Sequence, residues 1–328
     1  MARKKLRKFR KQIPLTANAN PEVNPPILGE PSSFSSSPWW ISDWWNLSNA
    51  GHNNDVISDC GTVGDLAVAA VSLRGNSHRL KGTPCEDSFC ISVGQTTEEG
   101  FIVAAIGDGV GSAKYSAYGS KKSTSLFVNN VSALLSKEED LSKETLESII
   151  DQSFSAMRDA VRNWYPGEHL APELEPSEVS VSELETTLTF AVIPSKPDQG
   201  GFRNIYCGFI GDSPIFRLSE KKWLSVPYSE ETTDILDSRT KGIQSTETFT
   251  LGTERFSDEE VLVLASDGVG NFLSIDNQNL AVGNYLAEQW SSPKSLPQII
   301  NDLSFDFRTA DDDRTVVICW LNRQQYTQ

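Results

Sequence analysis

Short apolar runs separated by turn-forming residues recur along the chain from about residue 65 to residue 321. Runs of roughly four to eight apolar residues, bounded by Gly, Pro, Asp or Asn, are typical of buried strands. The pattern therefore predicts that strands make up much of this region. The expected strands lie at residues 65–75, 87–93, 101–107, 186–194, 204–211, 214–219, 222–226, 247–251, 259–266 and 314–321.

Apolar residues spaced by three and four positions predict helices between and after these strands. These patterns lie at residues 115–135, 142–164, 280–290 and 296–303. Ser142 suits the N-cap of the second helix, and Glu144 falls in its first turn, where the helix dipole favours a carboxylate. The strands come in clusters rather than in regular alternation with helices, which predicts an α+β fold with largely antiparallel sheets.

The composition changes near residue 60 and divides the chain into two parts. Residues 1–60 are basic at first and then rich in Pro, Ser and Asn, which predicts a largely flexible tail ahead of one globular domain over residues 61–328. Four tryptophans in this tail are unusual, because large rings left in water form an exposed apolar patch. These tryptophans are Trp39, Trp40, Trp44 and Trp45. We expect them either to dock onto the globular domain or to bind a partner protein.

The charge is distributed unevenly. The formal net charge is −15, although seven of the 29 basic residues lie within the first eleven positions, so the remainder is more acidic still. An acidic body is a poor binder of nucleic acid, and part of its excess charge can belong to a cation site. The basic tail could contact an anionic membrane or RNA, fold back on the acidic body, or stay solvated.

Other features of the composition favour an intracellular protein. No apolar run approaches the roughly 18 residues of a membrane span, and the first residues lack the apolar centre of a secretory signal. The five cysteines are scattered and never spaced as a CxxC pair, so we expect reduced thiols rather than disulfides or a zinc ribbon. We therefore expect a cytoplasmic protein.

The tetrapeptide DGVG occurs twice, each time after an apolar run, and places Asp108 and Asp267 at the ends of two predicted strands. Asp-Gly at such a point is a common hairpin signal. Neither copy has the GxGxxG spacing or the GK[ST] of a phosphate loop, and the alternating ladder of an EF-hand is absent as well. The similarity does not extend beyond the tetrapeptide, so it is not an internal repeat.

Acidic residues stand at the edges of several other predicted strands. Carboxylates at the ends of neighbouring strands can converge on one rim of a sheet, where cations must offset their repulsion. A site built from oxygen ligands selects hard cations such as Mg²⁺ or Mn²⁺. The residues in this position are Glu86, Asp87, Asp108, Asp212, Asp267, Asp311, Asp312 and Asp313.

Six motifs occur in the order found in one known family. They read CEDSF, GDGVGSA, ETTLTF, GFIGDSPIF, LASDGVGNF and DDDRTVVI. In these motifs the chain resembles the type 2C metal-dependent serine/threonine protein phosphatases, over about residues 65–321. The resemblance implies an antiparallel β-sandwich flanked by helices, in four α-β-β-α layers, with two Mg²⁺ or Mn²⁺ ions at one end.

The resemblance also implies roles for the residues of the two DGVG segments. Asp108 matches the carboxylate that bridges both metal ions, and the carbonyl of Gly109 matches a ligand of one ion. Asp267 and Asp312 match ligands of the other ion.

Three further residues match supporting positions of the family. Glu86 and Asp87 match an acidic pair that holds metal-bound waters or a ligand position. Asp212 matches a residue that orders the site without being a primary ligand. Each of these carboxylates, taken alone, could equally be a cap or a turn residue.

The chain departs from the family at two positions, and both departures resemble a bacterial-type subgroup. Val110 stands where the family usually has a histidine that protonates the leaving alkoxide, and Gly82 lies at the nearest spacing of a phosphate-binding arginine. We expect His78 to replace the proton donor, although each replacement residue could equally be an ordinary surface or loop residue. The candidates for phosphate binding are Arg74, Arg79 and Lys81.

The resemblance implies that two metal ions acidify a water, which attacks phosphoserine or phosphothreonine in a protein substrate without a side-chain nucleophile. Two alternatives remain open from the sequence. One is a catalytically inactive module of the same fold that binds phosphoproteins or a regulator without turnover, whereas the active enzyme would be expected to act in signalling. The other is a hydrolase of small phosphorylated metabolites.

Overall fold

The computed structural model describes residues 28, 30, 55–163, 180–226, 242–246 and 249–321. The predicted tail lies largely outside the described residues, as do all four of its tryptophans. In the described part, no helix is long and apolar enough to cross a membrane.

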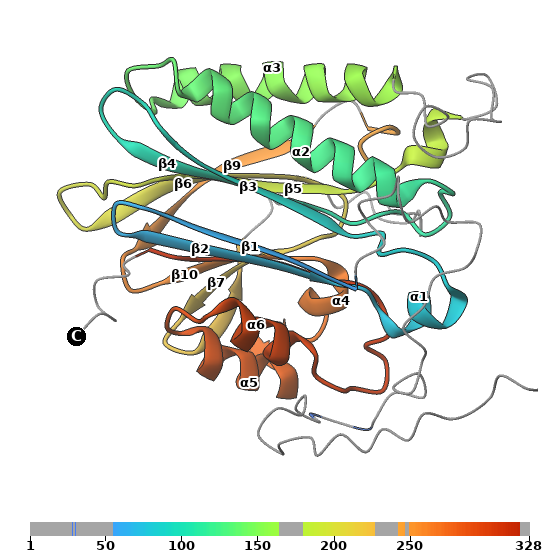
Figure 1. Cartoon of the computed structure of the whole chain (residues 1–328). Coiled ribbons are helices and arrows are strands. Elements are labelled where there is room, and N and C mark those ends of the chain that lie inside the picture. Colours follow the sequence, from blue (N-terminus) through green and yellow to red (C-terminus); the bar gives the residue numbers. More distant parts are fainter. Residues whose placement is uncertain are drawn as a thin grey trace, which may run out of the picture.

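Two antiparallel sheets pack face to face at the centre of the molecule (Figure 1). One sheet has the strand order β3-β4-β5-β6-β9. Its strands are β3 (Ser88–Gln95), β4 (Gly100–Gly107), β5 (Leu188–Pro194), β6 (Phe202–Ile210) and β9 (Thr250–Ser257).

The second sheet has the order β1-β2-β13-β10-β7-β8. Its strands are β1 (Val56–Val63), β2 (Leu66–Leu73), β13 (Arg314–Trp320), β10 (Val261–Ala265), β7 (Ile215–Ser219) and β8 (Lys222–Ser225). A small hairpin of β11 (Ser274–Ile275) and β12 (Gln278–Asn279) lies outside both sheets.

Helices cover the outer face of each sheet, which gives four layers (Figure 1). The five-stranded sheet is covered by α2 (Ser116–Leu135) and α3 (Lys143–Arg162). The six-stranded sheet is covered by α5 (Ala281–Trp290) and α6 (Leu296–Leu303). The short elements are α1 (Asn76–Lys81), the 3₁₀ turn η4 (Val181–Leu184) and α4 (Asp267–Gly270).

The apolar run of β4 shows why this layering follows from the sequence. Successive side chains of a strand point to opposite faces. Phe101 and Val103 pack against the helices, whereas Ile102 and Ala104 pack between the sheets. A strand buried on both faces needs apolar residues at every position, and all eight residues of β4 are buried.

The predicted α+β sandwich with outer helices is confirmed. The expected strand at residues 247–251 instead runs over Thr250–Ser257, because it pairs with β6 along that length. Six elements were not expected: β1, α1, η4, α4, β11 and β12. β1 begins at Val56, a few residues before the boundary expected at residue 60, because it pairs along its whole length with β2.

The pairing registers bring the acidic strand ends to one end of the sandwich. Ser88 pairs with Gly107, so Asp87 and Asp108 leave adjacent strands side by side. Leu188 pairs with Ile210, which brings the segment before β5 next to the segment that follows β6.

Candidate metal centre

A cavity of about 410 Å³ opens where these strand ends meet. Both sheets contribute to it. The strands β3, β4 and β6 adjoin Asp87, Asp108 and Asp212, whereas β10 and β13 adjoin Asp267, Asp312 and Asp313. The carboxylates that line it are Glu86, Asp87, Asp108, Asp212, Asp267, Asp312 and Asp313. Seven of the eight acidic positions identified at strand edges therefore line one cavity, and the eighth, Asp311, does not.

The loop that carries Asp108 is held by the segment before β5. The amide of Asp108 donates a hydrogen bond to Thr187 Oγ1 at 2.9 Å. Its carbonyl accepts hydrogen bonds from the amide of Thr187 and from Thr186 Oγ1, both at 2.8 Å. Gly109 and Thr186 form an isolated antiparallel bridge. The first DGVG segment is thus pinned by backbone and hydroxyl groups of the ETTLTF motif.

Gly109 leaves no room for a side chain. A Cβ atom at this position would lie 2.8 Å from the carbonyl oxygen of Glu86 and 2.8 Å from the Cβ atom of Ser116. The glycine therefore lets the Asp108 loop approach the acidic pair closely.

The second DGVG segment is a single helical turn rather than a hairpin. Ser266 occupies its N-cap, and Asp267 is its first residue. Ser266 Oγ accepts a hydrogen bond from the amide of Thr315 at 3.0 Å, which ties the turn to β13. The carboxylates of Asp267 and Asp108 lie close enough to share a hydrogen bond.

Burial and mutual repulsion disfavour ionisation of the central carboxylates. Burial, followed by neighbouring carboxylates, raises the pKa of Asp108 well above its ordinary value. The same causes raise the pKa values of Asp87 and Asp267. Burial also raises the pKa of Glu86 to about 7, despite the opposing influence of His78. The site thus concentrates more negative charge than it can hold ionised without cations.

The residues fit hard divalent cations. Asp87 Oδ2 is buried and has no hydrogen-bond partner among the described residues. A buried carboxylate oxygen without a donor is unfavourable unless an ion or a water satisfies it. The carboxylates and the Gly109 backbone offer oxygen ligands only, which is the donor set that Mg²⁺ and Mn²⁺ prefer.

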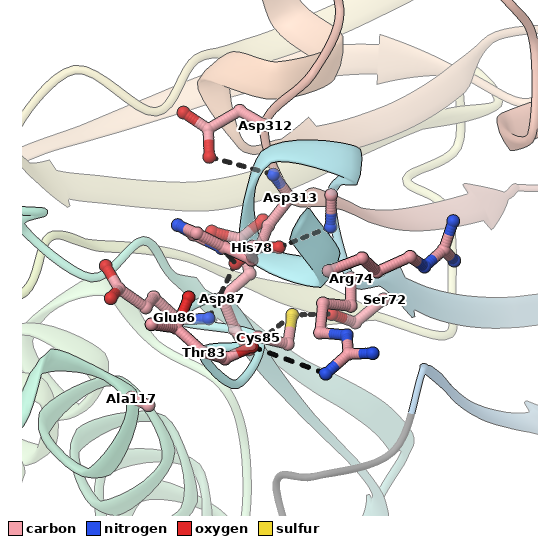
Figure 2. Close-up of polar contacts among 12 residues, drawn as sticks. Ser72, Arg74, His78, Thr83, Cys85, Glu86, Asp87, Ala117, Asp312 and Asp313 are labelled. Carbon is pink, nitrogen blue, oxygen red and sulfur yellow. Dashed lines mark hydrogen bonds and ion pairs between the residues drawn. The ribbon is translucent and has the colours of Figure 1, made fainter. Parts of the chain in front are cut away.

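Asp313 is the site residue to which the sequence assigned no role. Its side chain is 2 % exposed and accepts three hydrogen bonds (Figure 2). Burial opposes its ionisation, but the charge and hydrogen bond of His78 outweigh burial and hold the pKa of Asp313 below its ordinary value. Strand alternation gives no signal for this residue, because Asp313 precedes β13 and every residue of that strand is buried.

His78, from α1, lines the cavity as expected of a proton donor. Its Nδ1 lies 2.8 Å from Asp313 Oδ2. Burial alone would lower the pKa of His78, but Asp313 outweighs this effect and raises it to about 9. The Asp313 carboxylate therefore favours the protonated imidazole.

Only one of the three expected phosphate-binding residues lines the cavity, namely Lys81. Arg74 forms an ion pair of 2.7 Å with Asp55, and Arg79 contacts the same carboxylate at 3.3 Å. The placement of Arg74 and Arg79 in a phosphate site is therefore corrected: Asp55, just before β1, holds both guanidinium groups away from the cavity lining.

Val110 lines the cavity and offers no proton there. Its amide donates to the carbonyl of Glu185 at 3.1 Å.

Asp212 and Asp312 also line the cavity, and both side chains are exposed. Asp312 Oδ1 accepts the amide of Asp313 at 2.9 Å, which sets the geometry of the loop before β13.

Comparison with known proteins gives both a family match and similar folds. The family model described as protein phosphatase 2C matches residues 74–298. The solved structure of the S. agalactiae serine/threonine phosphatase is similar with a TM-score of 0.51 and 14% identity, covering 78% of this chain and 99% of that chain. No curated protein matches the chain.

Two further solved structures are similar at a lower TM-score. RsbX in complex with magnesium gives a TM-score of 0.46 at 14% identity, covering 80% of this chain and 98% of that one. The Mycobacterium tuberculosis serine/threonine phosphatase PstP/Ppp gives 0.46 at 19% identity, covering 78% and 99%.

Proposed function

The chain belongs to the protein phosphatase 2C family, and on that premise we propose that it hydrolyses phosphoserine and phosphothreonine in proteins with the help of Mg²⁺ or Mn²⁺. One observation carries the proposal: seven carboxylates from both sheets face a single cavity, and burial with mutual repulsion raises the pKa values of the central ones. Cations are the physical remedy for that repulsion.

Asp108 and the carbonyl of Gly109 would hold the cations together with Asp267 and Asp312. Glu86 and Asp87 would hold them directly or through water, and Asp212 would order the same cluster. When bound, two such cations supply Lewis-acid activation of water and neutralise charge on the phosphoryl oxygens. The protein contributes fixed ligands and a cavity that admits a phosphate group.

Lys81 is assigned to substrate phosphate. It is the only residue with a lysine or arginine side chain among the described residues that line the cavity. Its charge offsets part of the repulsion between an anionic substrate and the carboxylates around it.

His78 is assigned to the leaving group. The oxygen of water bonds to phosphorus and one proton of that water passes to solvent, while the bond between phosphorus and the alkyl oxygen breaks. The departing alkyl oxygen takes a proton from His78 Nε2. The imidazole regains a proton from solvent, so the products are the alcohol and inorganic phosphate. Such a positioned acid typically contributes about 10²–10⁴-fold to the rate.

Turnover of a phosphothreonine peptide, measured with Mn²⁺, with Mg²⁺ and in excess chelator, tests the proposal. We expect turnover with either cation and none in chelator. Full turnover in chelator would overturn the metal dependence. Tight peptide binding without turnover would indicate an inactive binding module, and hydrolysis confined to phosphorylated metabolites would indicate a small-molecule enzyme.

A further inference from the structure

We propose that Asp313 is a positioning residue, which fixes the ring of His78 and the backbone of Glu86 with one buried carboxylate. The inference rests on the proposed function, because it matters for turnover only if His78 protonates a leaving group. It concerns a residue that would not itself touch the substrate.

Three donors from two segments converge on Asp313 (Figure 2). The amide of Gly75 donates to Oδ1 at 2.6 Å. The amide of Glu86 and Nδ1 of His78 both approach Oδ2, at 2.6 Å and 2.8 Å. Because both carboxylate oxygens are bonded, the group cannot rotate without losing at least one of these contacts.

These contacts fix which nitrogen of His78 is available for chemistry. An imidazole that donates its Nδ1 proton to a carboxylate has only Nε2 left for another partner. The ring of His78 lines the cavity, so Nε2 is the nitrogen that can serve a substrate there. Asp313 therefore fixes the orientation of the His78 ring as well as favouring its protonated form.

Close packing of the start of α1 against the Asp311–Asp313 loop further restricts the position of His78. The amide of Ser77 donates to the carbonyl of Asp311 at 2.9 Å. A Cβ atom on Gly75 would clash with the backbone of Asp312, so only glycine allows the helix to begin so close to the loop. The position of α1, which carries His78, is thus fixed relative to the residues that precede β13.

The contact with Glu86 links the proton donor to the acidic pair. Glu86 lines the cavity beside His78, and its amide shares Asp313 Oδ2 with the imidazole. Asp313 Oδ2 therefore lies between the backbone of Glu86 and the ring of His78.

A second buried carboxylate provides a matched control. Asp302 is 5 % exposed and accepts hydrogen bonds from the Tyr285 hydroxyl at 2.8 Å and Trp290 Nε1 at 3.2 Å. None of these three residues lines the cavity. Asp302→Asn removes the same charge from a similarly buried group, so it reports the purely structural consequence of such a change.

The kinetic experiment compares Asp313→Asn, His78→Gln, the double variant and Asp302→Asn at saturating Mn²⁺. Each is assayed on a phosphothreonine peptide and on an aryl phosphate, whose leaving group needs little protonation. We expect Asp313→Asn to lower peptide turnover by about 10–10²-fold, and aryl turnover much less. The double variant should be about as slow as His78→Gln alone, because both changes remove the same positioned acid.

The second readout does not depend on activity. In the metal-free protein, the proton NMR signal of the hydrogen-bonded ring N–H, assigned by its loss in His78→Gln, should disappear or move upfield in Asp313→Asn and persist in Asp302→Asn. An unchanged signal in Asp313→Asn would overturn the proposal. Equal losses on both substrates, or additive losses in the double variant, would also overturn it.

Failure of the proposed function would look different. If wild-type protein hydrolysed neither substrate, the proposed phosphatase activity would be wrong. The NMR signal would still decide whether Asp313 fixes the ring of His78.

Discussion

Asp108 and Thr187 are joined by a reciprocal pair of hydrogen bonds. The Asp108 amide donates to Thr187 Oγ1 at 2.9 Å, and the Thr187 amide donates to the Asp108 carbonyl at 2.8 Å. Thr187 Oγ1 also lies 3.2 Å from Ser213 Oγ, next to Asp212. One hydroxyl thus connects the loops that carry two of the cavity carboxylates.

Replacing this hydroxyl should weaken metal binding. Thr187→Val keeps the shape of the side chain but leaves the Asp108 amide without its acceptor, a loss of roughly 1–3 kcal/mol when the amide is buried. Thr187→Ser keeps the oxygen. We expect a lower Mn²⁺ affinity by calorimetry in Thr187→Val and near wild-type affinity in Thr187→Ser. Equal affinities in the two variants would show that the hydroxyl is dispensable.

Most of the fold could be predicted because its strands are long enough to show their pattern. β4 is apolar throughout, and α3 has its buried residues at helical spacing. β1 escaped prediction because it is largely exposed and contains Ser58, Asp59 and Gly61, so it lacks an apolar run. Its position is set by pairing with β2, which a local pattern does not reveal.

The site could be predicted in part for a similar reason. The carboxylates stand at strand ends, and the pairing of strands brings them together. The fates of Arg74 and Arg79 could not be anticipated, because they depend on Asp55, which is distant in sequence and precedes an unexpected strand. The role of Asp313 depends equally on a helix, α1, that was too short to recognise.

The stability of the metal-free protein should fall as pH rises from about 5 to 7. A carboxyl group whose pKa is raised in the folded state binds its proton more tightly there than in the unfolded chain. Its favourable contribution is complete below the unfolded pKa of about 4 and is lost as pH rises through the folded value. Glu86, with a pKa of about 7, and Asp108 both belong to this class.

Thermal melting of the metal-free protein at several pH values measures this slope. Asp108→Asn should show a smaller decrease between pH 5 and 7 than wild type, whereas the surface variant Glu259→Gln should not differ. Mn²⁺ should raise the melting temperature most at the higher pH, because it binds the ionised carboxylates of the folded state. A melting temperature that rises with pH in the absence of metal would contradict the expectation.

Deletion of residues 1–30 should leave turnover of a small phosphopeptide within a few-fold of the full chain. The described contacts of this segment are modest. The Leu28 amide donates to the Asp306 carbonyl at 3.1 Å, and Glu30 pairs with Arg308 at 2.7 Å, with both side chains at least 70 % exposed. Exposed ion pairs contribute little to stability.

Comparison with a deletion of residues 1–27, which retains Leu28 and Glu30, isolates these contacts. The longer deletion should lower the melting temperature slightly, and the shorter one should not. Nearly complete loss of peptide turnover in either deletion would show that the tail is part of the catalytic unit.

The two DGVG aspartates should differ in their dependence on Mn²⁺. Asp108 lies at the centre of the carboxylates, and burial with the charges of four neighbours raises its pKa. If both cations share it, Asp108→Asn removes a ligand from each, and turnover should nearly vanish at any Mn²⁺ concentration. Asp267 lies on the short helical turn α4, which follows β10 of the six-stranded sheet. We expect it to bind mainly one cation, so high Mn²⁺ should recover part of the activity of Asp267→Asn.

Neither change should destabilise the metal-free fold, because removing one carboxylate relieves repulsion among the others. Mn²⁺ affinity, turnover and metal-free melting of both variants are to be measured beside Glu259→Gln as a surface control. If both segments served only as turns, Asn would replace Asp without effect, since Asn-Gly forms such turns equally well. Wild-type turnover in Asp108→Asn would therefore defeat the assignment of Asp108 to the metal centre.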